Sequence, residues 1–199
     1  MGNPLYDDEV GKMCFNPAKS FQLGWYPENV QTLDLGVGDM WQGQLVGVAD
    51  YLNNPDNNKI VMKLETGTNE DYFVGFNRAT GINSQNDLCD DCVTVIKAGN
   101  GNSYAQSWNQ IDPLGGMSSA GQEHTISGFR NTSYDLTIQV LDINTTTSPG
   151  TATVKISFGD ASICKDWCYT ITIPFQSPSG GIQKCDFVGL CDACNECSN

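Results

Sequence analysis

The strongest constraint on the fold is a series of eight short strand-like segments with almost no helical pattern between them. In the clearest of them, 134–143, Leu136, Ile138 and Val140 alternate with other residues, as in a strand with one buried face. Turn sequences such as 53–58 and 148–150 separate the segments. This pattern predicts an antiparallel β-sandwich and argues against a βαβ fold. The eight segments are 41–51, 59–65, 71–77, 92–98, 125–129, 134–143, 151–158 and 167–175.

One short helix precedes the strands. Asn16 is a good N-cap, Pro17 suits the first helical position, and Gly24 can end the helix. We therefore expect a helix over 16–23, and we expect the aromatic residues in and beside it to contact the core: Phe15, Phe21 and Trp25.

Charge excludes two classes of partner. The 199 residues carry 10 Lys and Arg against 23 Asp and Glu, a net charge of −13. Nucleic acid and anionic membrane surfaces are bound by clustered basic residues, so neither is expected as a partner. No stretch approaches the roughly 18–20 apolar residues of a membrane-spanning helix. The polar surface comes from uncharged residues, with 18 Asn and 21 Gly.

Nine cysteines indicate an oxidising compartment. The glycosylation sequons at Asn131 and Asn144 agree with a secreted protein, although the first residues do not resemble a signal peptide. We expect disulfides rather than zinc at the CxxC pairs, with the connectivity left open: Cys164 can pair with Cys168, and the tail cysteines with one another or with Cys89 and Cys92. An odd number leaves one cysteine without an internal partner. The cysteines are Cys14, Cys89, Cys92, Cys164, Cys168, Cys185, Cys191, Cys194 and Cys197.

No catalytic set can be assembled from the sequence. His124 is the single histidine, which is too few for a zinc peptidase site. The sequence also shows no Ser-His-Asp or Cys-His pair with a convincing arrangement around it, and we expect His124 on the surface at a strand start. Two acidic clusters, 7–9 and 87–91, do not match a calcium loop and are expected to be solvated. Four tryptophans are expected to pack in the core or at its edge, with sugar stacking as the alternative: Trp25, Trp41, Trp108 and Trp167.

The segment from Met1 to Tyr26 resembles the gametolysin family of metzincin zinc peptidases. The similarity lies in the Met-Gly start followed by an acidic stretch, and in the run Cys-Phe-Asn, Ala-Lys and Gln-Leu-Gly-Trp-Tyr between Cys14 and Tyr26. The segment 71–83, Asp-Tyr-Phe-Val-Gly-Phe-Asn-Arg-Ala-Thr-Gly-Ile-Asn, is similar to the β region that follows the catalytic domain. The resemblance covers residues 1–100 well and 101–175 loosely.

The resemblance also implies where parts of the family's domains would lie in this chain. Met1 matches the methionine of the Met-turn below the zinc, although Asn3 departs from the tyrosine often found there. Residues 1–30 would be the C-terminal end of the catalytic domain, 31–176 the β-sandwich domain, and 177–199 a linker with a Cys-rich tail. The HExxH zinc helix precedes the Met-turn in this family, so zinc would belong to the full-length parent only, and we expect this chain to bind none.

These features predict the C-terminal fragment of a secreted gametolysin-like zinc metallopeptidase acting on extracellular-matrix or cell-wall glycoproteins. Its partner would be a missing N-terminal catalytic half, and Cys14 would pair with a cysteine there. A complete, non-catalytic β-sandwich that binds glycan or matrix protein through Trp41 or Trp108 is the alternative. A structural zinc domain built on the CxxC pairs is a third possibility. We also expect that removing the segment from Met1 to Tyr26 improves solubility.

Overall fold

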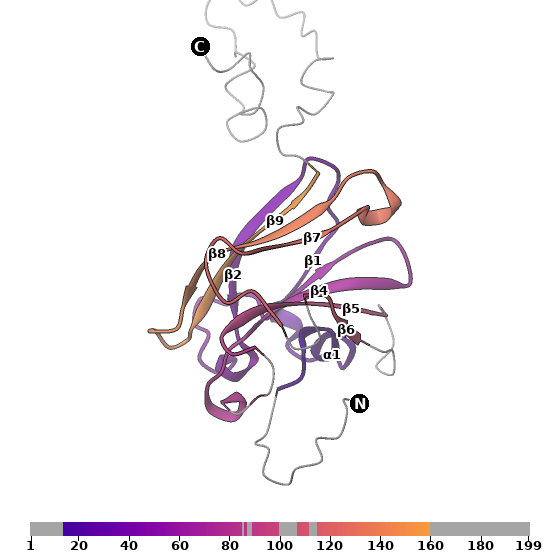
Figure 1. The fold of residues 1–199 in the computed structure, drawn as a ribbon. Coiled ribbons are helices and arrows are strands. Elements are labelled where there is room, and N and C mark those ends of the chain that lie inside the picture. Colours follow the sequence, from indigo (N-terminus) through magenta and orange to yellow (C-terminus); the bar gives the residue numbers. More distant parts are fainter. Residues whose placement is uncertain (1–13, 85, 87–88, 100–106, 112–114, 160–199) are drawn as a thin grey trace, which may run out of the picture.

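The computed structural model describes residues 14–84, 86, 89–99, 107–111 and 115–159. Within them the protein is mainly β, with two sheets and one short α-helix (Figure 1). The five-stranded sheet has the order β1-β3-β4-β5-β6, and the four-stranded sheet has the order β2-β9-β8-β7. The elements are α1 Pro17–Gln22, β1 Val30–Leu33, β2 Met40–Val46, β3 Val61–Leu64, β4 Glu70–Asn77, β5 Cys92–Gly99, β6 Ser107–Asn109, β7 Glu123–Ile126, β8 Leu136–Asn144 and β9 Thr151–Phe158.

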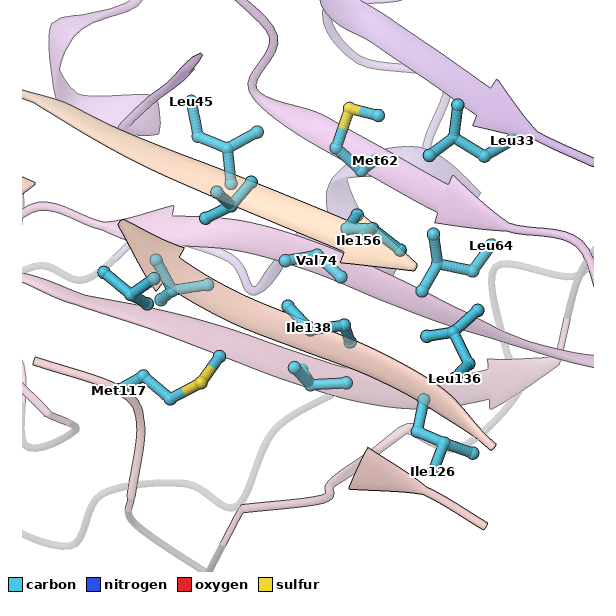
Figure 2. Close-up of a cluster of buried hydrophobic side chains, with 14 of the residues drawn as sticks. Leu33, Leu45, Met62, Leu64, Val74, Met117, Ile126, Leu136, Ile138 and Ile156 are labelled. Carbon is cyan, nitrogen blue, oxygen red and sulfur yellow. The ribbon is translucent and has the colours of Figure 1, made fainter. Parts of the chain in front are cut away.

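The two sheets share one hydrophobic core. Every second residue is buried throughout β9 and in β8 as far as Val140, since alternate side chains of a strand point to the same face. Figure 2 shows Ile138 and Ile156 of one sheet beside Val74 and Leu64 of the other. The predicted alternation of Leu136, Ile138 and Val140 is confirmed.

Most predicted strands are present, with shifted ends. The predicted strand 41–51 ends at Val46, and a 3₁₀ turn, η2 (Val48–Asp50), follows it. The strand expected at 125–129 lies at Glu123–Ile126, because Gly128 adopts a left-handed conformation (φ 61°) and turns the chain into η4 (Phe129–Asn131). The predicted strand 167–175 and the tail lie outside the described residues.

The prediction of a wholly antiparallel arrangement is wrong at one edge. β1 pairs in parallel with β3, from Val30 opposite Val61 to Leu33 opposite Leu64. Neither β1 nor β6 was expected, because these short segments show no alternation of buried and exposed residues. Their neighbours in the sheet stabilise them instead.

Helix α1 covers the outer face of the five-stranded sheet (Figure 1). The predicted N-cap is confirmed, since Asn16 Oδ1 accepts the backbone N–H of Lys19 at 2.9 Å. Phe21 packs on Phe73 as expected for a core contact, with ring centroids 5.1 Å apart. A Cβ atom on Gly75 would come within 2.9 Å of Pro17 Cβ, so this glycine lets the helix approach the sheet closely.

Candidate functional site

A group of aromatic side chains lies at the start of the described chain, and we name it the entry surface: Phe15, Trp25, Tyr26 and Tyr51. The ring centroids are 5.4 Å apart for Phe15 and Trp25, 6.3 Å for Trp25 and Tyr26, and 4.5 Å for Tyr26 and Tyr51. Phe15 and Trp25 expose 48% and 42% of their surface. The prediction that these two contact the core is therefore wrong, because they flank α1 and do not lie on its buried face.

The entry surface is anchored by the loop that follows β4. The backbone N–H of Cys14 donates to Asn83 Oδ1 at 2.9 Å, across 69 residues of sequence. Asn83 Nδ2 donates to Asn77 Oδ1 at 2.9 Å, and Asn77 Nδ2 donates to the carbonyl oxygen of Cys89 at 2.8 Å. Two amide side chains thus connect the beginning of the described chain with the CxxC loop.

Arg78 joins the same loop to the β8–β9 turn. Its Nη1 lies 2.6 Å from Asp91 Oδ1, and its Nη2 donates to the carbonyl oxygen of Thr145 at 3.2 Å. Gly47 and Gly150 lie against the Arg78 side chain, and a Cβ atom on either would clash with it. Asp91, expected in a solvated acidic loop, is partly exposed and is held in this ion pair.

The other acidic residues of the two predicted clusters, 7–9 and 87–91, form no cluster among the residues that the structure describes. Asp90 is exposed, and its Oδ1 accepts a hydrogen bond from Asn86 Nδ2 at 3.1 Å. Residues 7–9 and Asp87 lie outside the described residues, as does Met1. Among the residues that the structure describes, no group of three or more His, Cys, Asp or Glu is placed to hold a metal ion.

A cavity of about 120 Å³ opens beside the start of β4, at the far end of that strand from Asn77. It lies between the five-stranded sheet and the loop that follows β7, and we name it the inter-sheet cavity. The residues that matter for its chemistry come from three separate segments: Thr66, Glu70, Tyr72, Lys97, Arg130 and Asn131. No sequence motif marks it, because these segments are brought together only by the fold.

The charges around the inter-sheet cavity are paired. Lys97 Nζ lies 3.0 Å from Glu70 Oε2, and this hydrogen bond raises the pKa of Lys97. The Arg130 guanidinium pairs with Asp34 and donates to two backbone carbonyl oxygens, each at 2.8 Å. Both cations are thus neutralised, and the cavity offers hydrogen-bond donors and acceptors without a net charge.

A second group of charges is buried beside α1. Lys63 Nζ lies 2.9 Å from Asp71 Oδ2 and 2.6 Å from Glu65 Oε2, and 5.5 Å from the centroid of the Phe21 ring. The Asp71 side chain is fully buried, and its Oδ1 accepts the backbone N–H of Thr66 at 2.8 Å. Burial alone would lower the pKa of Lys63, but hydrogen bonds to the two carboxylates raise it.

The tryptophans have different environments. Trp41 packs against the core, and its indole lies over Gly43, two residues along β2. Trp108 is exposed on the edge strand β6, with 47% of its surface accessible. The predicted packing role is therefore confirmed for Trp41. Trp108 lies at the edge of the sheet with about half of its surface exposed, and Trp167 lies outside the described residues.

Three of the nine cysteines lie in the described residues. Cys89 and Cys92 form a disulfide, while Cys14 is free and half-buried, and burial raises the pKa of its thiol. The other candidates lie outside the described residues, so their pairing stays a prediction: Cys164, Cys168, Cys185, Cys191, Cys194 and Cys197.

His124 lies at the second position of β7, close to the predicted strand start, and is half-buried. Burial lowers the pKa of its imidazole.

The two sequons differ: Asn131 is exposed and lines the inter-sheet cavity, whereas Asn144 is half-buried. Asn144 Oδ1 accepts hydrogen bonds from the N–H and the hydroxyl of Thr146, at 3.0 and 2.7 Å.

Comparison with protein-family models, with curated proteins and with solved structures finds no match to this chain. None of the helices in the described residues is long and apolar enough to cross a membrane.

Proposed function

We propose that this chain is the C-terminal, non-catalytic part of a secreted gametolysin-like zinc metallopeptidase that acts on extracellular-matrix or cell-wall glycoproteins. The observation that carries the proposal is the entry surface. The run between Cys14 and Tyr26, which resembles the family, carries two exposed aromatic rings, Phe15 and Trp25. Exposed apolar patches of this kind are typical of surfaces that bind another protein domain.

The geometry of the rings favours a protein partner over a glycan. A flat platform for an extended glycan would need neighbouring aromatic faces in one plane. Neighbouring rings of the entry surface are instead inclined to one another by 57°, 75° and 58°. Tilted and edge-to-face arrangements are the usual packing of aromatic side chains in protein cores and interfaces. The partner in this proposal is an N-terminal catalytic domain.

The residues of this chain do not fit a catalytic zinc site. Such a site uses three protein ligands, most often histidines, and the sequence holds one histidine. Zinc and the hydrolytic groups would therefore belong to the parent polypeptide. In this proposal residues 1–30 end the catalytic domain, 31–176 form an extracellular β-sandwich and 177–199 form a cross-linked tail. The packing of α1 on β3, β4 and β5 would then hold the two domains together.

The protein isolated from its source tests the proposal. Peptides of residues 59–97 should be found, by mass spectrometry, in a polypeptide clearly larger than 21.6 kDa that contains zinc and cleaves gelatin in a gel. A chelator should abolish the cleavage, and the purified chain of 199 residues should show none. A native protein that is no larger than this chain and lacks zinc would contradict the proposal.

A second candidate is a non-catalytic extracellular module that binds glycan or matrix protein. The exposed ring of Trp108 on the edge strand β6 is the observation that favours it. Trp108→Ala should then abolish binding to a glycan array while the melting temperature stays the same. Trp41→Ala is not an equivalent probe, because Trp41 packs against the core and its removal destabilises the fold. Binding that survives Trp108→Ala would count against this platform.

A further inference from the structure

One glycosylation sequon forms part of the wall of the inter-sheet cavity. Asn131 lines the cavity, is exposed, and begins the triplet Asn131-Thr132-Ser133. Its backbone is left-handed (φ 58°), as is that of Arg130 (φ 58°), a conformation uncommon for residues other than glycine. The loop therefore holds the acceptor asparagine at the mouth of the cavity. A sugar attached to Asn131 Nδ2 would start at this point.

The chemistry of the cavity suits a neutral sugar that carries an amide. Tyr72 supplies an aromatic ring, and the Lys97–Glu70 pair supplies a donor and an acceptor. Because Lys97 and Arg130 each have a carboxylate partner, the site has no charge for an ionic ligand to match. A volume of about 120 Å³ is well below the roughly 300–1,000 Å³ of pockets for drug-sized ligands. It suits a group about the size of one sugar ring.

We propose that Asn131 is N-glycosylated and that the first sugar of this glycan, an N-acetylglucosamine, binds in the inter-sheet cavity. The covalent link makes binding intramolecular. Even a weak binding site is then occupied, because a short tether gives the sugar a high effective concentration. The sugar would connect the loop after β7 to β4 and β5.

The second sequon gives an internal contrast. Asn144 does not line this cavity, and its Oδ1 is occupied by two hydrogen bonds from Thr146. A glycan at Asn144 would therefore extend into solvent and leave the stability of the fold unchanged. The inference rests on the secreted location in the proposed function, but it does not depend on the peptidase.

The test uses the full chain, secreted with an added signal peptide from a cell line that makes high-mannose glycans. Peptide mass spectrometry should find Asn131 occupied. Ser133→Ala removes this sequon but keeps Asn131, and it should lower the melting temperature by about 2–4 °C. Endoglycosidase H leaves a single N-acetylglucosamine on the asparagine, so the trimmed protein should melt like the untrimmed one. The matched control, Asn144→Asp, removes the other sequon, keeps an acceptor oxygen for Thr146, and should leave the melting temperature unchanged.

A variant in the inter-sheet cavity tests whether the glycan stabilises the protein through its contacts there. Lys97→Met should lower the melting temperature of the glycosylated protein and have little further effect in the Ser133→Ala background. An unoccupied Asn131, or equal melting temperatures for Ser133→Ala and the parent chain, would overturn the proposal. So would trimming that destabilises as much as Ser133→Ala, because the stabilising contacts would then belong to the outer sugars. These outcomes do not bear on the peptidase proposal, since the location is imposed by the added signal.

Discussion

Lys63 carries a buried positive charge on the outer face of the five-stranded sheet. It is surrounded by the carboxylates of Asp71 and Glu65 and by the ring of Phe21. The Asp71 side chain has no exposed surface, so its charge is stabilised by Lys63 and by the hydrogen bonds from Thr66. Removing one member of a buried ion pair leaves the other charge uncompensated in a medium of low dielectric constant.

We therefore expect Lys63→Met to lower the free energy of unfolding by about 3–5 kcal/mol. The addition of Asp71→Asn should recover part of the loss, because the buried charge is then gone. Urea unfolding of protein made without N-glycans measures both effects. Lys97→Met removes the cation of an exposed pair, Lys97–Glu70, and as the control it should cost less than about 1 kcal/mol. Equal losses for the two lysine variants would contradict this account of the buried group.

At the scale of elements, α1 has two sides with opposite properties. Its inner side, with Ala18 and Phe21, lies on the sheet, and the residues that flank it form part of the exposed entry surface. The sequence suggested that removing the segment from Met1 to Tyr26 would improve solubility. The structure reverses this expectation, because the helix covers a buried apolar group on the outer face of the sheet: Ile60, Val61, Phe73, Ile96 and Ala98.

Deletion of residues 1–26 should therefore lower the soluble yield and the melting temperature. Each large apolar side chain that the deletion uncovers loses about 1.5–3 kcal/mol of burial free energy. The double variant Phe15→Ser and Trp25→Ser is the control, since it keeps α1 and removes exposed aromatic surface, and it should raise the soluble yield. Soluble fractions after expression, measured side by side, decide between the two. A higher yield for the deletion would show that α1 is dispensable.

At the scale of the whole molecule, strand β4 connects the two candidate sites. It starts with Glu70 at the inter-sheet cavity and ends with Asn77 beside the anchor of Cys14. Eight residues of strand place these ends roughly 25 Å apart. The anchor of Cys14 and the inter-sheet cavity therefore lie at opposite ends of this strand.

The redox state of the chain is a property of the whole molecule. It is measured by counting the free thiols. With nine cysteines, complete pairing leaves one thiol, and we expect it to be Cys14. Because burial raises its pKa, this thiol should react slowly with an alkylating reagent at neutral pH in the native protein. It should react quickly after denaturation without reductant, and peptide mapping should identify it. Eight or nine reactive thiols would contradict the disulfide prediction and favour zinc or a reducing compartment.

The helix and most strands of the described chain could be predicted from the sequence because their signals are local. Asn16 caps α1 through its contact with nearby Lys19, and the alternation in β8 and β9 reflects one buried face within each strand. The parallel strand β1 could not be predicted, since so short a segment carries no period and its partner β3 lies beyond the whole of β2 in the sequence. Phe15 and Trp25 were wrongly predicted to contact the core, because the hydrophobicity of a residue does not indicate which side of a helix packs on the sheet.

The sequence by itself therefore determined a mainly β chain with one capped helix, a strongly acidic surface and a resemblance that suggests a family. Only the tertiary structure decided which tryptophan is exposed, which carboxylate is buried and where the sequons lie. The inter-sheet cavity combines Tyr72 with Asn131, and the anchor combines Cys14 with Asn83. Contacts between residues so distant in the sequence leave no periodic signal, because they depend on how two sheets pack and not on the conformation of any one segment.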